Sequence, residues 1–195
     1  MQNRFDKWAE TYDKSILNYL IFNSVRKKIC NILGNLEDKK VLDVGCGTGT
    51  LLKELAEKNP NSYFIGIDSS KKMIEAADKK KIKNLEFFIR NSENLNFPEE
   101  RFDYILSSFS FHHWPNQEKS IENCYRILKK QGKLIIVDLS LPIYLLGGKG
   151  TTKILTSKEM KKLFKSKSFE VKQYPGANFW NLGYYFEKIT IGEKY

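Results

Sequence analysis

A glycine-rich loop between a short apolar segment and an amphipathic helix limits the folds open to this chain more than any other segment. Residues 41–44 form the apolar segment, and Gly45, Gly47 and Gly49 follow it at alternate positions. Glycines permit a tight turn and let a ligand approach the backbone closely. Open α/β sheets bind their ligands beyond the carboxyl ends of the strands, where a loop of this kind lies. The loop therefore predicts an α/β fold with a ligand site beside it.

The rest of the 195 residues alternates apolar, strand-like segments with amphipathic, helix-like segments. This alternation is typical of a mostly parallel sheet whose two faces are covered by helices. We therefore expect a doubly wound α/β fold with a seven-stranded sheet, in which the last strand is antiparallel. The predicted strands are 41–44, 63–67, 85–89, 103–106, 133–137, 169–174 and 184–191, and the predicted helices are 3–13, 15–33, the segments that follow Gly49 and Ser70, 116–129 and 157–166.

The spacing of the glycines and the nearby carboxylates indicate which ligand the loop binds. The dinucleotide fingerprint is G-x-G-x-x-G, but Thr50 occupies the sixth position here and the spacing is G-x-G-x-G. Asp43, two residues before the first glycine, would repel a pyrophosphate and suits a ligand with an ammonium group. Asp68 ends the next strand, where a carboxylate can accept hydrogen bonds from ribose hydroxyls. These features favour S-adenosylmethionine over NAD, and an NAD-dependent oxidoreductase is the weaker alternative.

Several segments, in order over residues 40–140, resemble the class I S-adenosylmethionine-dependent methyltransferases. The chain most resembles the subgroup that contains ubiquinone and menaquinone biosynthesis methyltransferases, and residues 5–13 are also similar to that subgroup. The resemblance implies a Rossmann-like methyltransferase fold, S-adenosyl-L-methionine as cofactor and S-adenosyl-L-homocysteine as product. Besides the glycine loop, the segments that carry the resemblance are 66–70 with Met73, 91–97, 102–114 and 128–133.

The resemblance also implies which residues contact the cofactor. Tyr12, in the N-terminal helix, would close over the cofactor, and Cys46 would pack against it rather than act as a nucleophile. Asn91 stands where the family usually has aspartate, so its amide oxygen would be a neutral acceptor for the adenine amino group. The expected cofactor-binding residues are Tyr12, Asp43, Gly45, Cys46, Gly47, Gly49, Asp68, Ser69, Met73, Asn91, Ser92, Glu93 and Ser107.

The only two histidines of the chain, His112 and His113, follow the fourth predicted strand, where an acceptor would enter. A general base is needed only if the acceptor must lose a proton. One of these histidines is therefore a candidate catalytic residue, and the alternative is that the pair packs in the turn beside Trp114. The three cysteines do not have the spacing of metal ligands, so we expect no metal site.

The net charge of +10 raises the question of a nucleic-acid acceptor. Only five of the 33 basic residues are arginine, the side chain that reads phosphates and bases best, and the lysines are spread over many segments. We therefore expect a small-molecule methyl acceptor. A tRNA or other RNA methyltransferase and a non-catalytic S-adenosylmethionine-binding protein are the alternatives, and the oligomeric state stays open.

The apolar runs are too short to span a membrane, and the first residues lack the apolar core of a secretory signal. We therefore expect a cytoplasmic protein without membrane segments. Residues 1–195 are expected to form a single methyltransferase domain. Within this domain, residues 1–35 would form a helical lid, residues 40–140 the cofactor-binding core, and residues 141–195 a substrate-side loop and the last strands.

Overall fold

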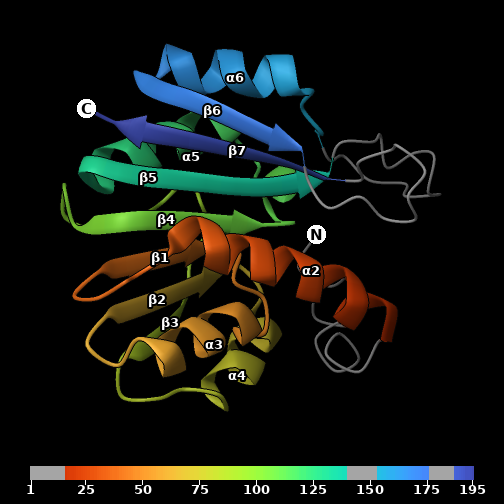
Figure 1. The fold of residues 1–195 in the computed structure, drawn as a ribbon, viewed down its shortest axis with the longest axis vertical. Helices are drawn as coiled ribbons and strands as arrows, with labels where there is room; N and C mark the ends of the chain where they lie inside the picture. Colours follow the sequence, from red (N-terminus) through yellow and green to blue (C-terminus); the bar gives the residue numbers. More distant parts are fainter. Residues whose placement is uncertain (1–15, 140–152, 176–186) are drawn as a thin grey trace. The chain divides into compact units, whose positions relative to one another are not determined.

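The computed structural model describes residues 16–139, 153–175 and 187–195 (Figure 1). The chain divides into two compact units, residues 1–91 and residues 92–195, and each is described by itself. Among the described residues, no helix is long and apolar enough to cross a membrane.

Some of the predictions fall on residues that the structure does not describe. These are the helix at 3–13 with Tyr12, and most of the loop that begins the substrate-side segment.

The first unit contains three parallel strands. β1 (Lys40–Val44) pairs with β2 (Tyr63–Asp68), and β2 pairs with β3 (Leu85–Ile89). Because parallel strands place their carboxyl ends at one edge, the residues that follow β1 and β2 lie close together. The helices of this unit are α2 (Ile16–Leu33), α3 (Thr50–Lys58) and α4 (Lys71–Asp78).

Apolar side chains fill the core of the first unit, and two glycines let an aromatic ring approach the backbone. Phe64, Ile67 and their neighbours on β1 and β2 are almost fully buried, as the apolar runs predict. Phe87 packs so closely on β2 that a Cβ atom on Gly66 would lie 2.6 Å from its ring. A Cβ atom on Gly49 would lie 2.4 Å from the same ring. Gly49 therefore serves packing as well as loop conformation, and Gly66 serves packing within β2.

Gly34 and Ser70 cap two helices of the first unit. Gly34 ends α2 with a φ of 60°, and its N–H donates to the carbonyl oxygen of Cys30 at 3.0 Å. Ser70 caps α4, because its hydroxyl accepts a hydrogen bond from the N–H of Met73 at 3.2 Å. Ser70, rather than the adjacent Ser69, is therefore the N-cap of α4.

The second unit contains four strands. β4 (Phe102–Ser108) is parallel to β5 (Leu128–Leu139), which pairs antiparallel with β7 (Glu187–Lys194), and β7 pairs antiparallel with β6 (Phe169–Pro175). The predicted antiparallel direction of the last strand is confirmed, and the two units together hold the expected seven strands within the described residues. The helices of this unit are η2 (Phe111–His113), α5 (Gln117–Ile127) and α6 (Ser157–Ser166).

Two predicted boundaries in the second unit were wrong. α5 ends at Ile127 rather than at residue 129, and β5 begins at Leu128 rather than at residue 133. The reason is that Leu128 is already extended and pairs with Phe102 of β4. Gln131, which precedes the predicted strand at 133–137, lies within β5. It takes a left-handed φ of 62° although it is not a glycine.

Candidate active site

The glycine loop has a backbone conformation that only glycine adopts readily. Gly45, Gly47 and Gly49 have φ angles of 80°, 54° and 73°. The N–H groups of Gly45 and Cys46 both donate to the carbonyl oxygen of Ile67, at 2.8 and 3.0 Å, and this ties the loop to the end of β2. A Cβ atom on Gly47 would meet nothing within 4 Å. The loop therefore borders open space at Gly47, as a ligand-binding loop requires.

The Asp68 carboxylate holds this loop against the start of α4. Its Oδ2 accepts from the N–H of Gly47 at 3.0 Å, and its Oδ1 accepts from the N–H of Ser70 at 2.8 Å. A carboxylate has about four acceptor sites, so the chemistry of this side chain also suits hydrogen bonds from the hydroxyls of a ribose. The sequence predicted the ligand contact but not the bond to Gly47.

Asp43 carries a buried carboxylate whose charge is not compensated. Its side chain is 3% exposed, and within the described chain its Oδ1 has no hydrogen-bond partner. Burial raises the pKa of Asp43 to about 7, and the nearby Asp68 carboxylate contributes to the rise. Burial of an unpaired carboxylate is costly, so the site favours a cationic group beside Oδ1. The ammonium of S-adenosylmethionine fits this requirement, whereas a pyrophosphate does not.

Cys46 is not suited to act as a nucleophile. Burial raises the pKa of its thiol, and the carboxylates of Asp43 and Asp68 raise it further. Its Sγ packs close to the backbone of Gly66, where a Cβ atom would lie 2.8 Å away. Among the described residues, no group of three or more His, Cys, Asp or Glu side chains could hold a metal ion.

The other predicted cofactor residues divide between the two units. In the first unit Ser69 and Asn91 are exposed, and Met73 is buried on α4. In the second unit Ser92 and Ser107 are buried and Glu93 is half-buried. The hydroxyl of Ser92 accepts from that of Ser120 at 2.9 Å, Asn123 Nδ2 donates to the carbonyl oxygen of Glu93 at 2.9 Å, and the hydroxyl of Ser107 lies 3.5 Å from that of Ser110.

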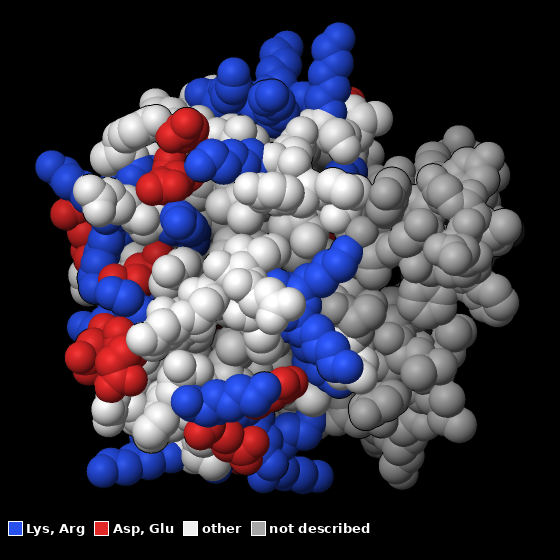
Figure 2. Space-filling view, viewed as in Figure 1, with Lys and Arg blue, Asp and Glu red and all other residues white. Residues whose placement is uncertain are grey.

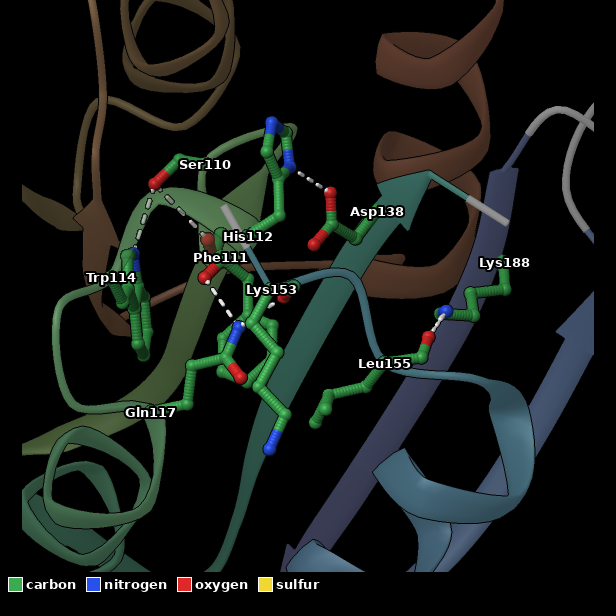
Figure 3. A network of polar contacts seen from close by, with 10 residues as sticks. Ser110, Phe111, His112, Trp114, Gln117, Asp138, Lys153, Leu155 and Lys188 are labelled. Atoms are coloured by element: carbon green, nitrogen blue, oxygen red, sulfur yellow. Dashed lines mark hydrogen bonds and ion pairs between the residues drawn. The ribbon is translucent and has the colours of Figure 1, made fainter. Parts of the chain in front are cut away.

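In the second unit, His112 and Asp138 form a buried pair (Figure 3). Their side chains are 5% and 2% exposed, and His112 Nδ1 lies 2.5 Å from Asp138 Oδ1. Because the carboxylate accepts from Nδ1, this nitrogen carries a proton and Nε2 is the acceptor in the neutral ring. Figure 3 shows the second ring nitrogen turned away from Asp138. The pair therefore has the geometry of a general base with an orienting carboxylate.

The short helix η2, which carries His112, is held by hydrogen bonds on both sides. Trp114 Nε1 donates to the hydroxyl of Ser110 at 3.0 Å. Gln117 Nε2 donates to the carbonyl oxygens of Phe111 and Lys153, at 3.1 and 2.9 Å (Figure 3). These bonds fix the backbone on which the His112 ring stands.

A lysine is also buried beside this pair. Lys188 is directly opposite Asp138 in the antiparallel β5–β7 register, and its Nζ donates to the carbonyl oxygen of Leu155. Burial lowers the pKa of Lys188, while the carboxylates of Asp138 and Glu159 act in the opposite direction. Asp138 thus contacts the imidazole of His112, while the ammonium of the neighbouring Lys188 is directed to the Leu155 carbonyl oxygen (Figure 3).

The structure distinguishes the two candidate histidines. His113 is half-buried, and its ring lies 3.9 Å from that of His112 at a tilt of 51°. His112 is the more deeply buried of the two, and its Nδ1 contacts the Asp138 carboxylate. Sequence analysis did not single out Asp138, which directly follows the predicted strand at 133–137. The sequence signal that could have identified Asp138 is a carboxylate near the carboxyl end of a buried strand, as at Asp43 and Asp68.

Comparison with known proteins identifies a matching family and related sequences. The family described as "Methyltransferase domain" matches residues 35–189. A demethylmenaquinone methyltransferase of Thermotoga maritima is 35% identical over 140 residues, which cover 71% of this chain and 61% of the relative. A ubiquinone/menaquinone biosynthesis C-methyltransferase of Wigglesworthia glossinidia brevipalpis is 29% identical over 144 residues, which cover 69% of this chain and 58% of the relative. The chain thus spans about three fifths of the length of these curated relatives.

Solved structures share the fold over nearly the whole chain. One is a chain of the complex between the Haloferax volcanii Trm112 methyltransferase activator and a methyltransferase, with a TM-score of 0.86, 18% identity, and coverage of 98% of this chain and 96% of that one. Another is a SAM-dependent methyltransferase of Thermotoga maritima, with a TM-score of 0.79, 20% identity and full coverage of both chains. These likenesses confirm the predicted Rossmann-like α/β fold.

Proposed function

This chain belongs to the class I S-adenosylmethionine-dependent methyltransferase family, and from that membership we propose that it methylates a small-molecule acceptor with an ionisable hydroxyl group. The observation that carries the choice of acceptor is the buried His112–Asp138 pair. A base of this kind is required only when the acceptor must lose a proton before or during attack. A thiolate or a neutral amine would not need it.

The names of the relatives support an acceptor of this class. One of them is named for demethylmenaquinone, and the other is named for ubiquinone and menaquinone biosynthesis. The reduced form of a quinone carries two aromatic hydroxyls, which ionise with difficulty at neutral pH because their pKa lies near that of tyrosine, about 10. A reduced demethylquinone is therefore the acceptor that we propose to test first.

Each candidate residue has a separate role in this proposal. S-adenosylmethionine, when bound, supplies a methyl group made electrophilic by the sulfonium. Asp43 pairs with the ammonium and Asp68 accepts from the ribose hydroxyls. Asn91, Ser92 and Glu93 contact the adenine, as the family resemblance implies. The other cofactor-binding residues expected from the sequence provide further contacts with S-adenosylmethionine.

His112 and Asp138 act on the acceptor. Nε2 of His112 accepts the hydroxyl proton of the acceptor, and Asp138 stabilises the imidazolium that results. The oxygen that has lost its proton either attacks the methyl carbon or donates its charge into the ring so that a ring carbon attacks. In both cases the electron pair of the methyl–sulfur bond stays with the sulfur. When a ring carbon attacks, that carbon then loses its proton and the oxygen regains one, which restores the aromatic ring.

An RNA acceptor is the second candidate, because the net charge of +10 favours an anionic partner. One assay separates the candidates. The protein is incubated with labelled S-adenosylmethionine and either a short-chain demethylated hydroquinone under anaerobic conditions or bulk tRNA. We expect label in the hydroquinone. Label in tRNA alone would establish the second candidate, and cofactor binding without turnover on either would indicate a non-catalytic binding protein.

Calorimetric titration gives an independent check on the cofactor. We expect binding of S-adenosylmethionine and S-adenosylhomocysteine and far weaker binding of NAD, because the Asp43 carboxylate repels a pyrophosphate. Equal or tighter binding of NAD would contradict the assignment of the glycine loop.

A further inference from the structure

Four lysines form one exposed stripe along α6, and we call them the lysine stripe. Lys158, Lys161, Lys162 and Lys165 are all exposed, and their spacing of i, i+3, i+4 and i+7 places them within about 100° of the helix circumference. Met160 and Phe164 lie on the opposite face, where they are 1% and 0% exposed. The helix is therefore anchored through its apolar face and turns its basic face outward.

The charge of the lysine stripe is not balanced within the described residues. The only acidic side chain of α6, Glu159, is engaged at the helix N-terminus, where it accepts from the backbone N–H and the hydroxyl of Thr156 at 2.7 and 2.8 Å. None of the four lysines is within 4.0 Å of a described carboxylate. Figure 2 shows basic side chains gathered along the top of the view, where α6 lies in Figure 1.

Both lysines of α3 are paired with glutamates of the same helix, in contrast to the lysines of the stripe. Lys58 lies 2.8 Å from Glu54 on α3, and Lys53 lies 3.5 Å from Glu57 on the same helix. Lys167, just after α6, is 3.1 Å from Glu122. A row of like charges repels itself, and an anionic surface relieves that repulsion.

We infer that the lysine stripe docks this protein on the anionic surface of a lipid bilayer, where the acceptor would be held. This inference rests on the proposed function, because a quinol with an apolar tail resides in the membrane. A bilayer is favoured over RNA for two reasons. The stripe contains lysine alone, whereas base and phosphate recognition favours the bidentate fork of arginine. It is also a straight row on one helix, which suits a flat surface that attracts point charges.

The geometry predicts that docking is electrostatic and reversible. Met160 and Phe164 of α6 are buried and Leu163 is half-buried, so the helix presents no fully exposed apolar side chain for insertion into the bilayer. Each lysine near an anionic bilayer strengthens binding by roughly fivefold, and salt screens the attraction. Four lysines therefore account for about a hundredfold or more.

The test measures sedimentation of the full chain with vesicles. One set of vesicles contains phosphatidylcholine alone and the other also contains phosphatidylglycerol. The test variant replaces all four lysines of the stripe with glutamine. The matched control replaces the same number of exposed lysines in the first unit with glutamine, so the net charge changes equally. The control positions are Lys71, Lys79, Lys81 and Lys83.

We expect the wild-type protein to bind only the anionic vesicles and to be released by salt. The stripe variant should lose about a hundredfold in affinity, and the control should keep most of it. Three results would overturn the inference. The first is that the stripe variant binds anionic vesicles as tightly as the wild type does. The second is that the control variant loses as much vesicle affinity as the stripe variant. The third is that the wild-type protein binds tRNA but not vesicles at the same salt concentration.

Turnover separates failure of this inference from failure of the proposed function. With a water-soluble short-chain hydroquinone, the stripe variant and the wild type should be equally active. With a long-chain hydroquinone in anionic vesicles, the stripe variant should be at least tenfold slower at low protein concentration. Equal rates on the embedded acceptor would overturn the docking inference. If the wild type binds the vesicles but methylates neither acceptor, the proposed function fails and the docking inference stands.

Discussion

Asp43 and Asp138 are both buried, and each is the second-last residue of its strand, β1 in the first unit and β5 in the second. They differ in what their carboxylates contact. Asp43 Oδ1 has no described hydrogen-bond partner, while Asp138 Oδ1 lies 2.5 Å from His112 Nδ1. The Asp43 carboxylate is left for a ligand to contact, whereas the Asp138 carboxylate accepts a hydrogen bond from a side chain of the protein.

This difference indicates two kinds of function for chemically identical side chains. A buried carboxylate without a partner is destabilised until a cation arrives, so it suits ligand binding. A buried carboxylate that already accepts a hydrogen bond from an imidazole fixes the tautomer of that ring, so it suits positioning of a base. The predictions below test this assignment of Asp43 to binding and Asp138 to positioning.

The largest effect is expected from Asp138→Asn. The amide no longer requires a proton on His112 Nδ1 and cannot stabilise the imidazolium, so turnover should fall by about 10²–10⁴-fold. His112→Gln should cause a similar loss and alter the pH–rate profile, while cofactor affinity stays unchanged in both variants. Steady-state kinetics over pH and calorimetric titration measure the two quantities.

His113→Ala is the matched control for this prediction. It should cost much less activity than His112→Gln, because the proposal assigns proton transfer to His112, which is buried and hydrogen-bonded to Asp138. Full activity of Asp138→Asn in a folded protein would show that the His112–Asp138 pair is structural.

Asp68→Ala should weaken cofactor binding by about 1.5–3 kcal/mol, the range for loss of a charged acceptor. Part of this loss arises because the carboxylate also holds the Gly47 N–H and thus the shape of the loop. The measurement is the dissociation constant of S-adenosylhomocysteine. Asp78→Ala removes an exposed carboxylate at the end of α4 and serves as the control. An unchanged constant for folded Asp68→Ala would exclude the ribose contact.

The raised pKa of Asp43 predicts that cofactor affinity depends on pH. The ammonium requires the ionised carboxylate, so affinity should rise as pH increases toward about 7 and then level off. The change should approach tenfold per pH unit below the pKa. Titrations at several pH values test this, and Asp43→Asn should bind weakly without that dependence. A wild-type affinity independent of pH would place the ammonium elsewhere.

Asp43 also affects stability in the absence of ligand. Its pKa is raised by folding, so the folded state holds this proton more tightly than the unfolded state does. The unfolding free energy should therefore decrease as pH rises from about 4 to about 7, and the Asp43 contribution should be constant above that range. Denaturant unfolding of the wild type and Asp43→Asn over this range isolates the contribution.

The smallest effect is expected from Asn91→Asp. A carboxylate accepts more strongly than an amide, so cofactor binding should tighten by a few-fold if this residue contacts the adenine amino group. Asn91 is exposed at the end of the first unit, so the substitution should not disturb folding. A neutral or weaker affinity would show that the segment lies away from the adenine.

The sequence by itself determined the elements and the cofactor loop, because these depend on local patterns. Apolar runs predicted all seven strands, and the alternate glycines predicted a loop whose left-handed φ angles require glycine. The lysine spacing on α6 was also present in the sequence as helical periodicity. Predictions of strands, helices and loops succeed because residues close together in the sequence determine the local backbone conformation.

Only the tertiary structure decided which distant side chains meet. Asp138 is 26 residues from His112, and Asp68 is 21 residues from Gly47. No periodicity links such residues, since their contacts depend on the register of strands and on the turns between them. Burial of Asp43 without a partner is likewise a property of the packed unit. The boundary at Leu128 was missed for the same physical reason, because pairing with Phe102 across the sheet overrides the local helical pattern.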